Sequence, residues 1–246
     1  MKFFYDKEKS MELMQKIEDE FGARSRKTAR GKEMHVSDLT GCQLRPYNRI
    51  TGIPRNQTKQ QVGVMVFGIV VETVLGWTYP KDELQYQSNL WLVKNDEGIF
   101  GHIDVYENKV HPLEVKASRK LIFRAKEVPV YWVEQLMTYM AMQSATKGWL
   151  VLFNVFSTQI MAFQMKLTTE DILDWLIVIN KRASKIRKAA DIGDPSELEI
   201  NPLQYNWCDY KDDCPRADEC KDMWKTIEAE KKAAKKEKDR KKSQLE

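Results

Sequence analysis

The positions of four cysteines constrain the fold of this 246-residue chain more than any other feature of its sequence. Cys208, Cys214 and Cys220 are evenly spaced, with five residues between neighbours, whereas Cys42 lies 166 positions before Cys208. The N-terminal sequence lacks the apolar segment and cleavage site of a signal peptide, so we expect a cytoplasmic (intracellular) protein whose thiols stay reduced. Three clustered thiols and one distant thiol then indicate a tetrathiolate metal site, which requires the two ends of the chain to meet.

The cysteines are compatible with two kinds of metal centre. Zn²⁺ and an iron–sulfur cluster both accept four cysteine ligands, and the local spacing does not separate them. Paired zinc ligands usually lie closer together, and a proline after a cysteine, as at Pro215, also occurs in cluster-binding sequences. The alternative is four unrelated buried thiols, but three of the four fall within 13 residues, which argues against it.

The composition describes a folded chain with an uneven distribution of charge. With 42% hydrophobic and 10% aromatic residues it is not disordered as a whole, and no apolar run is long enough to predict a membrane span. The formal net charge is +4, yet residues 21–60 hold nine basic and two acidic residues, and residues 227–246 hold eight and five. The remaining sequence is acidic. This pattern is typical of a protein that binds a polyanion through a basic surface and has a cluster of carboxylates elsewhere. A solvated charged surface would also explain it.

Apolar periodicity and turn signals predict the order of the elements. Helices are expected at 5–22, 61–77, 130–145 and 168–191, and strands at 87–94, 99–106, 110–117, 148–156 and 159–167. This order predicts an α/β (α+β) fold in which helices flank a mixed sheet. We expect three parts: an N-terminal helix and basic loop (1–34), a main domain with the cysteines (35–222), and a basic charged tail (223–246) that is frayed helix or disordered.

Two carboxylates and a lysine lie on neighbouring predicted strands. Asp104 is near the end of one strand, and Glu114 and Lys116 share a face of the next because they are two residues apart. If a short turn at 107–109 pairs the strands, Asp104 comes close to Glu114. Carboxylates can hold Mg²⁺ or Mn²⁺, and a lysine can orient a water or stabilise negative charge, as phosphodiester hydrolysis requires. A surface ion pair is the alternative.

Three further polar residues are candidates for the same site. Glu72 lies in an apolar predicted helix, where a charge among Val and Ile needs a partner, unless that side of the helix faces solvent. Gln135 and Tyr139 are four residues apart on one predicted helix and therefore share a face. That spacing alone is also typical of the polar edge of an amphipathic helix.

Taken together, these residues resemble a known family. The order Cys42, Glu72, Asp104, Glu114-x-Lys116, Gln135-x-x-x-Tyr139, Cys208, Cys214 and Cys220 is similar to that of RecB-like nucleases of the PD-(D/E)XK superfamily that carry an iron–sulfur cluster. These are the CRISPR-associated Cas-four exonucleases, with relatives in the AddB helicase–nuclease subunit. The resemblance covers roughly residues 35–222, and it makes that segment a PD-(D/E)XK nuclease domain.

The resemblance implies a restriction-endonuclease-like mixed sheet flanked by helices and a role for each residue. The family's metal-binding aspartate matches Asp104 in Gly-His-Ile-Asp, and its Glu-x-Lys pair matches Glu114 and Lys116. Its Gln-x-x-x-Tyr element, which helps to position the nucleic acid and the lysine, matches Gln135 and Tyr139. The metal ligands implied for Mn²⁺ or Mg²⁺ are Glu72, Asp104, Glu114 and the carbonyl of Val115. The ligands implied for a 4Fe-4S cluster are Cys42, Cys208, Cys214 and Cys220.

The chain departs from the family pattern at two places. The family usually has histidine in G-x-x-x-H, and this chain has Glu72 there. Glutamate also binds Mg²⁺ or Mn²⁺, so the change alters metal preference without abolishing the site. The family commonly spaces its late cysteines with two residues in the first gap, and here the gap between Cys208 and Cys214 is five residues. Zn²⁺ at the four cysteines therefore stays open.

The hypothesis drawn from the sequence is a metal-dependent DNA nuclease, an exonuclease acting on single strands or ends. DNA is the expected partner, no membrane partner is expected, and nuclease, helicase or CRISPR-adaptation proteins are the candidate protein partners. The basic segment 24–59 is expected to contact phosphates. The rival is a DNA-binding or adaptor component without activity, in a larger complex for recombination, repair or CRISPR-type defence.

Overall fold

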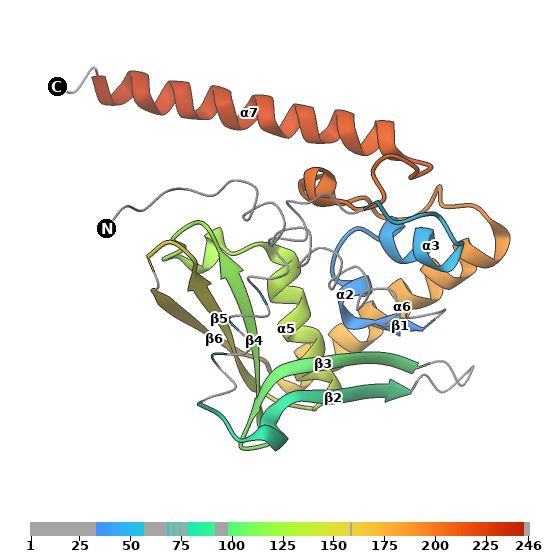
Figure 1. The fold of residues 1–246 in the computed structure, drawn as a ribbon, viewed down its shortest axis with the longest axis vertical. Helices are drawn as coiled ribbons and strands as arrows, with labels where there is room; N and C mark the ends of the chain where they lie inside the picture. Colours follow the sequence, from blue (N-terminus) through green and yellow to red (C-terminus); the bar gives the residue numbers. More distant parts are fainter. Residues whose placement is uncertain are drawn as a thin grey trace, which may run out of the picture.

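The computed structural model describes residues 33–56, 68, 71, 74, 78–91, 98–157 and 159–243 (Figure 1). Its helices are α2 (Val36–Leu39), α3 (Leu44–Ile50), α5 (Val130–Met142), α6 (Thr169–Ile192) and α7 (Ala217–Ser243), with the short 3-10 helices η1 (Lys81–Glu83), η2 (Ala125–Glu127) and η3 (Pro202–Trp207). Its strands are β1 (Met34–His35), β2 (Leu84–Trp91), β3 (Gly98–Glu107), β4 (His111–Ser118), β5 (Lys147–Asn154) and β6 (Ile160–Lys166). The helix predicted at 5–22 and nearly all of that at 61–77 lie outside the described residues.

The six strands form one mixed sheet in the order β1-β3-β4-β5-β6, with β2 on the other edge of β3. Strand β2 is antiparallel to β3, β3 to β4 and β5 to β6, whereas β4 and β5 are parallel because α5 connects them as a crossover. Along β3, the pairing with β1 is at Ile99 and Phe100, and the pairing with β4 is at 105–107. Strands β3 and β4 therefore diverge from their shared hairpin.

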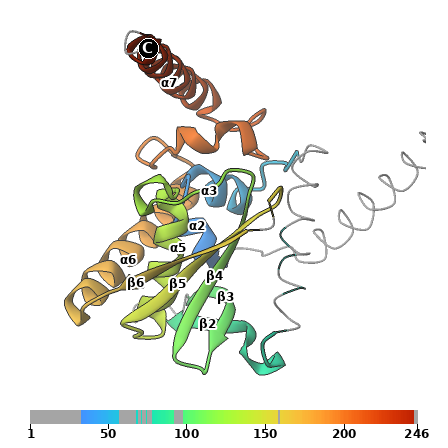
Figure 2. The same ribbon diagram turned by 90° about the vertical axis from the view of Figure 1, so that its left-hand side faces the viewer.

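Two apolar clusters hold the helices to the sheet. One joins α2, α3 and α6 to β3 and includes Met34, Ile103, Tyr139 and Ile179. The other joins α5 to β5 and β6, with Leu136 and Met140 against Leu150 and Leu152. Figure 2, turned by a right angle, shows α5 and α6 on the same side of the sheet as α2, while α7 extends away from it. The prediction of a mixed sheet flanked by helices is confirmed.

Local sequence signals explain where α6 begins and ends. The hydroxyl of Thr168 accepts a hydrogen bond from the backbone N–H of Asp171 at 3.1 Å, and the carboxylate of Asp171 accepts one from the N–H of Thr168 at 2.7 Å. This reciprocal pair is a capping box. The helix ends at Gly193, whose φ of 71° is the left-handed conformation that glycine adopts readily. The predicted apolar stripe is buried at Ile172, Ile179, Ala183 and Ile186.

Strand β5 and the C-terminal tail are described by the structure in more detail than the sequence pattern allows. Along β5, half-buried residues alternate with buried ones, because one face of the strand lies under α5. The tail after residue 222 was expected to be frayed helix or disordered. The structure shows a helix there, because α7 spans Ala217–Ser243. No helix in the described part of the chain is long and apolar enough to cross a membrane.

Candidate active site and cysteine cluster

The β3–β4 hairpin fixes the position of Asp104. Asn108 and Lys109 have positive φ angles of 53° and 55°, and the N–H of Lys109 donates to the carbonyl of Tyr106 at 3.0 Å, which closes a tight turn. The strands then pair through Val105 and Leu113. The next residues along the two strands are Asp104 and Glu114. At this position the carboxylate of Asp104 accepts a hydrogen bond from the N–H of Val115 at 2.8 Å. The side chain of Asp104 therefore lies against β4 where the two strands begin to diverge.

Glu114 and Lys116 form a pair on β4. The side chain of Glu114 is 1% exposed, and the ammonium of Lys116 donates a hydrogen bond to its Oε1 atom. The two residues are in register with Leu150 and Leu152, buried residues of β5 that lie under α5. A carboxylate at such a position loses its hydration and needs a cation nearby. The structure thus brings Asp104, Glu114 and Lys116 together on two adjoining strands.

Gln135 and Tyr139 lie on α5, which covers this part of the sheet. Tyr139 is buried and Gln135 is half-buried. The ring of Tyr139 packs on Gly101 so closely that a Cβ atom there would lie 2.7 Å from its Cε1 atom and 3.1 Å from its hydroxyl oxygen. Gly101, three residues before Asp104, is therefore a point of close approach between α5 and β3. The sequence signal was a glycine inside a strand pattern, which often marks such an approach.

Tyr131 was not predicted as a site residue. Burial raises the pKa of the Tyr131 hydroxyl, and the positive charges of Lys116 and Arg45 partly oppose that shift. Tyr131 therefore lies within electrostatic reach of Lys116. It precedes Gln135 by four residues on α5, so Tyr131, Gln135 and Tyr139 follow one face of the helix. That spacing was visible in the sequence and could have identified it.

The predicted metal ligands are only partly within the described residues. Glu72 lies outside them, so its position relative to Asp104 and Glu114 is not described. Within the described ranges, no group of three or more His, Cys, Asp or Glu side chains is spaced to hold a metal ion. The described carboxylates, Asp104 and Glu114, are nevertheless oxygen donors of the kind that Mg²⁺ and Mn²⁺ prefer.

The four cysteines are free thiols that lie near one another. Burial, and after it the charges of Cys42, Cys208 and Cys214, raise the pKa of Cys220 to about 12. Burial is also the main cause that raises the pKa of Cys208 to about 11, with Cys42 again contributing. Cys42, Cys208 and Cys220 therefore each sense the charge of a cysteine from the other segment of the chain. This set of donors matches a thiophilic metal centre, although the thiols are not spaced to coordinate an ion.

Backbone and side-chain contacts dock the segment around Cys42 on the segment around Cys208. The N–H of Cys42 donates to Oε1 of Gln204 at 2.9 Å. The N–H of Gln43 donates to the carbonyl of Glu199 at 3.0 Å, and the N–H of Glu199 donates back to Oε1 of Gln43 at 3.1 Å. The N–H of Asn56 donates to the carbonyl of Asp209 at 2.7 Å. These contacts bring the two ends of the main domain together.

A buried carboxylate reinforces the same junction. The side chain of Asp209 is 4% exposed and forms ion pairs with Arg45, at 3.2 Å, and with Arg55. Burial alone would raise the pKa of Asp209, but Arg45 and Arg55 outweigh it and hold the pKa below its usual value. Arg49 likewise pairs with Asp38 at 2.7 Å. These three arginines belong to the basic segment expected to contact phosphates, and all three form ion pairs within the protein.

Comparison with known proteins supports the fold. Neither a protein-family model nor a curated protein matches the sequence. Among solved structures, the crystal structure of SSO0001 matches with a TM-score of 0.56 and 18% identity, over 85% of this chain and 96% of that one. A phage-related exonuclease from Haemophilus somnus 129PT matches with a TM-score of 0.38 and 13% identity, over 65% of this chain and 93% of that one. The chain therefore shares its fold with SSO0001 over most of both molecules.

Proposed function

We propose that the protein is a metal-dependent nuclease that hydrolyses phosphodiester bonds in DNA, as an exonuclease acting on single strands or ends. One observation carries the proposal. The Asp104 carboxylate is held against β4 by the N–H of Val115, directly beside the buried Glu114 carboxylate and its partner Lys116. A surface ion pair would leave both partners in water, whereas Glu114 is 1% exposed.

Each residue has a defined task in this proposal. Asp104, Glu114, the carbonyl of Val115 and Glu72 would hold Mg²⁺ or Mn²⁺. The bound ion would supply polarisation of the phosphoryl oxygen and a lowered pKa of water. Lys116 orients the attacking water or stabilises the negative charge that develops on the phosphate. Gln135 steadies the substrate strand, and Tyr139 fixes α5 against Gly101 so that Gln135 stays beside the site.

The four cysteines have a structural task in the same proposal. Cys42, Cys208, Cys214 and Cys220 would bind a 4Fe-4S cluster, with Zn²⁺ as the alternative, and so close the chain ends around the catalytic sheet. Their position beside the Asp209 ion pairs, which hold two distant segments of the chain together, favours a structural role over a redox role in catalysis. Metal analysis with an anaerobic absorption spectrum tests the choice: iron with broad visible absorption supports the cluster, and zinc without iron rejects it.

The activity is tested with purified full-length protein and end-labelled DNA. Single-stranded and double-stranded oligonucleotides are incubated with Mn²⁺, with Mg²⁺ or with a chelator, and the products are resolved by length. Shortened products that require the divalent ion support the proposal. Binding of DNA without cleavage under all conditions would instead identify an adaptor for recombination, repair or CRISPR-type defence. This rival is favoured by Glu72, which stands where the family usually has histidine.

A further inference from the structure

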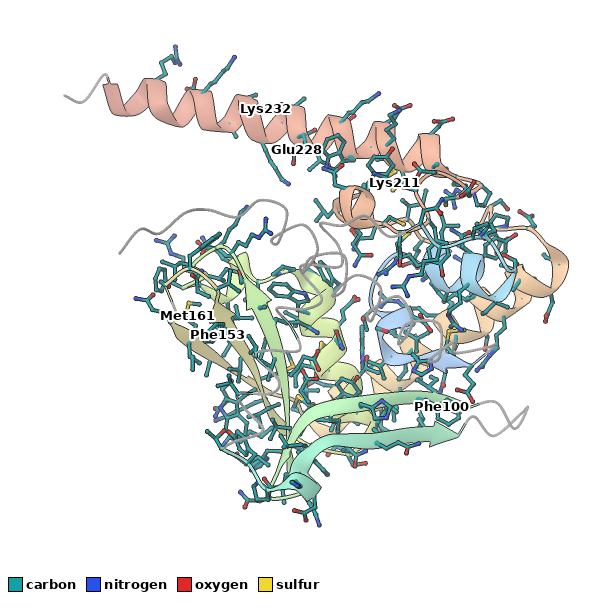
Figure 3. The ribbon with its side chains drawn as sticks, viewed as in Figure 1. Phe100, Phe153, Met161, Lys211, Glu228 and Lys232 are labelled. Carbon is teal, nitrogen blue, oxygen red and sulfur yellow. The ribbon has the colours of Figure 1, made fainter. Side chains whose placement is uncertain are left out.

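The parallel strands β4 and β5 end side by side, at Ser118 and Asn154. In sheets with parallel strands, ligands commonly bind beyond the carboxyl ends of those strands. Lys116 lies on β4 two residues before this end, which is about 7 Å along a strand. Figure 3 labels Phe153 and Met161, which mark the same end of the β5–β6 hairpin. The loops that follow Ser118 and Asn154 are therefore neighbours of the candidate active site.

Buried polar side chains fix both loops. The hydroxyl of Ser118, 7% exposed, donates to the carbonyl of Lys120 at 2.8 Å and accepts from the N–H of Lys120 at 3.1 Å. Oδ1 of Asn154, 2% exposed, accepts from the N–H of Phe156 at 3.0 Å and from the N–H of Ser157 at 2.9 Å. The N–H of Val155 also donates to the carbonyl of Ser118 at 3.0 Å, which ties one loop to the other.

These fixed loops expose aromatic side chains to solvent. Phe123 is 68% exposed and Phe156 is 76% exposed, although Ile122, next to Phe123, is buried against α5 and β5. The loop is thus anchored by Ile122 and still directs Phe123 outwards. Leu121 and Ile160 are exposed in the same two segments. Large apolar side chains left exposed on two loops that are tied together suit a binding surface.

The loop after β4 is also strongly basic. Between Ser118 and Val128 it carries four exposed cations and one acid, Glu127; the cations are Arg119, Lys120, Arg124 and Lys126. Within the described residues, no acidic side chain forms an ion pair with any of these four. Cations interleaved with exposed aromatic rings are the pattern that binds single-stranded nucleic acid, because phosphates meet the charges and bases stack on the rings.

We propose that Phe123 and Phe156 form a stacking platform for unpaired bases of a DNA strand, with Arg119, Lys120, Arg124 and Lys126 holding its phosphates. The proposal rests on the proposed nuclease function and deepens it, since the platform would bind the single-stranded segment that leads to Lys116. The composition of the loop favours nucleic acid as occupant over an acidic or apolar protein surface, because four cations and the exposed ring of Phe123 lie in one short segment.

Binding is measured without divalent ions, by fluorescence anisotropy of a labelled oligothymidine and of a blunt duplex. In the Lys116→Ala background, Phe123→Ala and Phe156→Ala are each expected to weaken binding of the single strand roughly 5- to 150-fold, the range for one base–aromatic stack. Phe123→Trp should keep the affinity, whereas Phe123→Leu should lose it, because only a ring can stack. Ile177→Ala, an exposed apolar residue of α6, is the matched control and should change nothing.

An abasic oligonucleotide distinguishes stacking from other effects. If the platform stacks bases, removing the bases weakens wild-type binding, and Phe123→Ala then causes no further loss. Unchanged affinity of both phenylalanine variants for the single strand would overturn the proposal, even if the protein cleaves DNA. A change in oligomeric state on substitution, with DNA binding unchanged, would reassign the surface to protein contacts. The platform and the nuclease can also be separated. If wild type binds the single strand without cleaving it, and the phenylalanine variants lose that binding, the platform is supported and the nuclease is rejected.

Discussion

At the scale of single residues, the candidate site depends on what surrounds each charge. Glu114 is a carboxylate with almost no access to water, and its partner Lys116 is partly exposed. Such a pair contributes little to stability, because the cost of desolvation offsets the attraction between the charges. A protein that keeps the pair at this position is therefore expected to use it for chemistry.

The substitution Glu114→Gln separates chemistry from stability. It removes the buried charge and keeps the shape, and Lys116 can turn towards solvent, so we expect a melting temperature within about 2 °C of wild type. Cleavage of DNA should fall at least about 100-fold, because a ligand and charge partner are lost. Thermal melting and a cleavage assay on one preparation check both. A large fall in melting temperature would instead assign Glu114 a structural role.

The close contact between Gly101 and Tyr139 predicts that Gly101→Ala is destabilising. The added Cβ atom would lie 2.7 Å from the Tyr139 ring and 2.8 Å from the side chain of Val36, so both neighbours must move. Overpacking of this kind costs about 1–3 kcal/mol. Differential scanning calorimetry of wild type and variant measures it. A variant as stable as wild type would show that Tyr139 is free to shift and does not fix α5.

The sequence predicted the charged members of the site better than the packing around them. Asp104, Glu114 and Lys116 could be placed on adjoining strands because strand alternation and a short turn are local properties. The contact of Gly101 with Tyr139 and the burial of Asp209 depend on residues far apart in the chain. No spacing pattern records which residues make such contacts, so the partner of Gly101 and the burial of Asp209 emerged only from the structure.

At the scale of elements, the strongest local signals gave the most accurate predictions. Helix α6 was expected to begin at Thr168 or Thr169 and spans Thr169–Ile192, because a capping box starts it and a glycine ends it. Strand β1, by contrast, has two residues and exists only through its pairing with β3. Its sequence carries no periodicity, which explains why it was not predicted.

The capping box of α6 can be tested by Thr168→Ala. The variant loses the side-chain bond to the N–H of Asp171 and should be destabilised by about 1 kcal/mol, seen as a fall of about 2–4 °C in melting temperature. Thr168→Ser keeps the hydroxyl and is the control. An unchanged melting temperature for Thr168→Ala would mean that tertiary packing alone starts the helix.

The same cap predicts a dependence on acid pH. The hydrogen bonds from Thr168, first the backbone N–H and then the hydroxyl, hold the pKa of Asp171 below its usual value. A group whose pKa is lowered by folding stabilises the protein above its unfolded pKa, and this contribution is lost as the pH falls through the folded pKa. The difference in melting temperature between wild type and Asp171→Asn should therefore shrink in acid. A difference that grows in acid would contradict the assignment.

At the scale of the whole molecule, the chain closes on itself through segments 42–56 and 199–213. The sequence suggested this closure through the cysteines alone. The structure adds the reciprocal bonds of Gln43 with Glu199 and the ion pairs of Asp209, which hold the two segments without reference to a metal. Tyr131 senses the charges of both Lys116 on β4 and Arg45 in the closure, so the two parts of the molecule lie near the same residue of α5.

Asp209→Asn is expected to weaken the closure. It leaves the guanidinium groups of Arg45 and Arg55 without their shared carboxylate, and breaking a buried pair commonly costs about 3–5 kcal/mol. Both arginine side chains are more than a third exposed, so solvent reduces the cost, and we expect about 2 kcal/mol. Urea unfolding measures it, with Asp222→Asn on exposed α7 as control. Equal stability of the two variants would contradict a role for Asp209 in closure.

If Asp104, Glu114 and Lys116 form a nuclease site, the substitution Lys116→Ala must slow the single-turnover cleavage of DNA. The rate is measured with excess protein, Mn²⁺ and the oligonucleotide form that wild type cuts fastest. Lys181→Ala, on an exposed position of α6, controls for the loss of a lysine. We expect a rate at least about 100-fold below wild type for Lys116→Ala and an unchanged rate for Lys181→Ala. Equal rates for wild type and Lys116→Ala would exclude a nuclease site at these three residues.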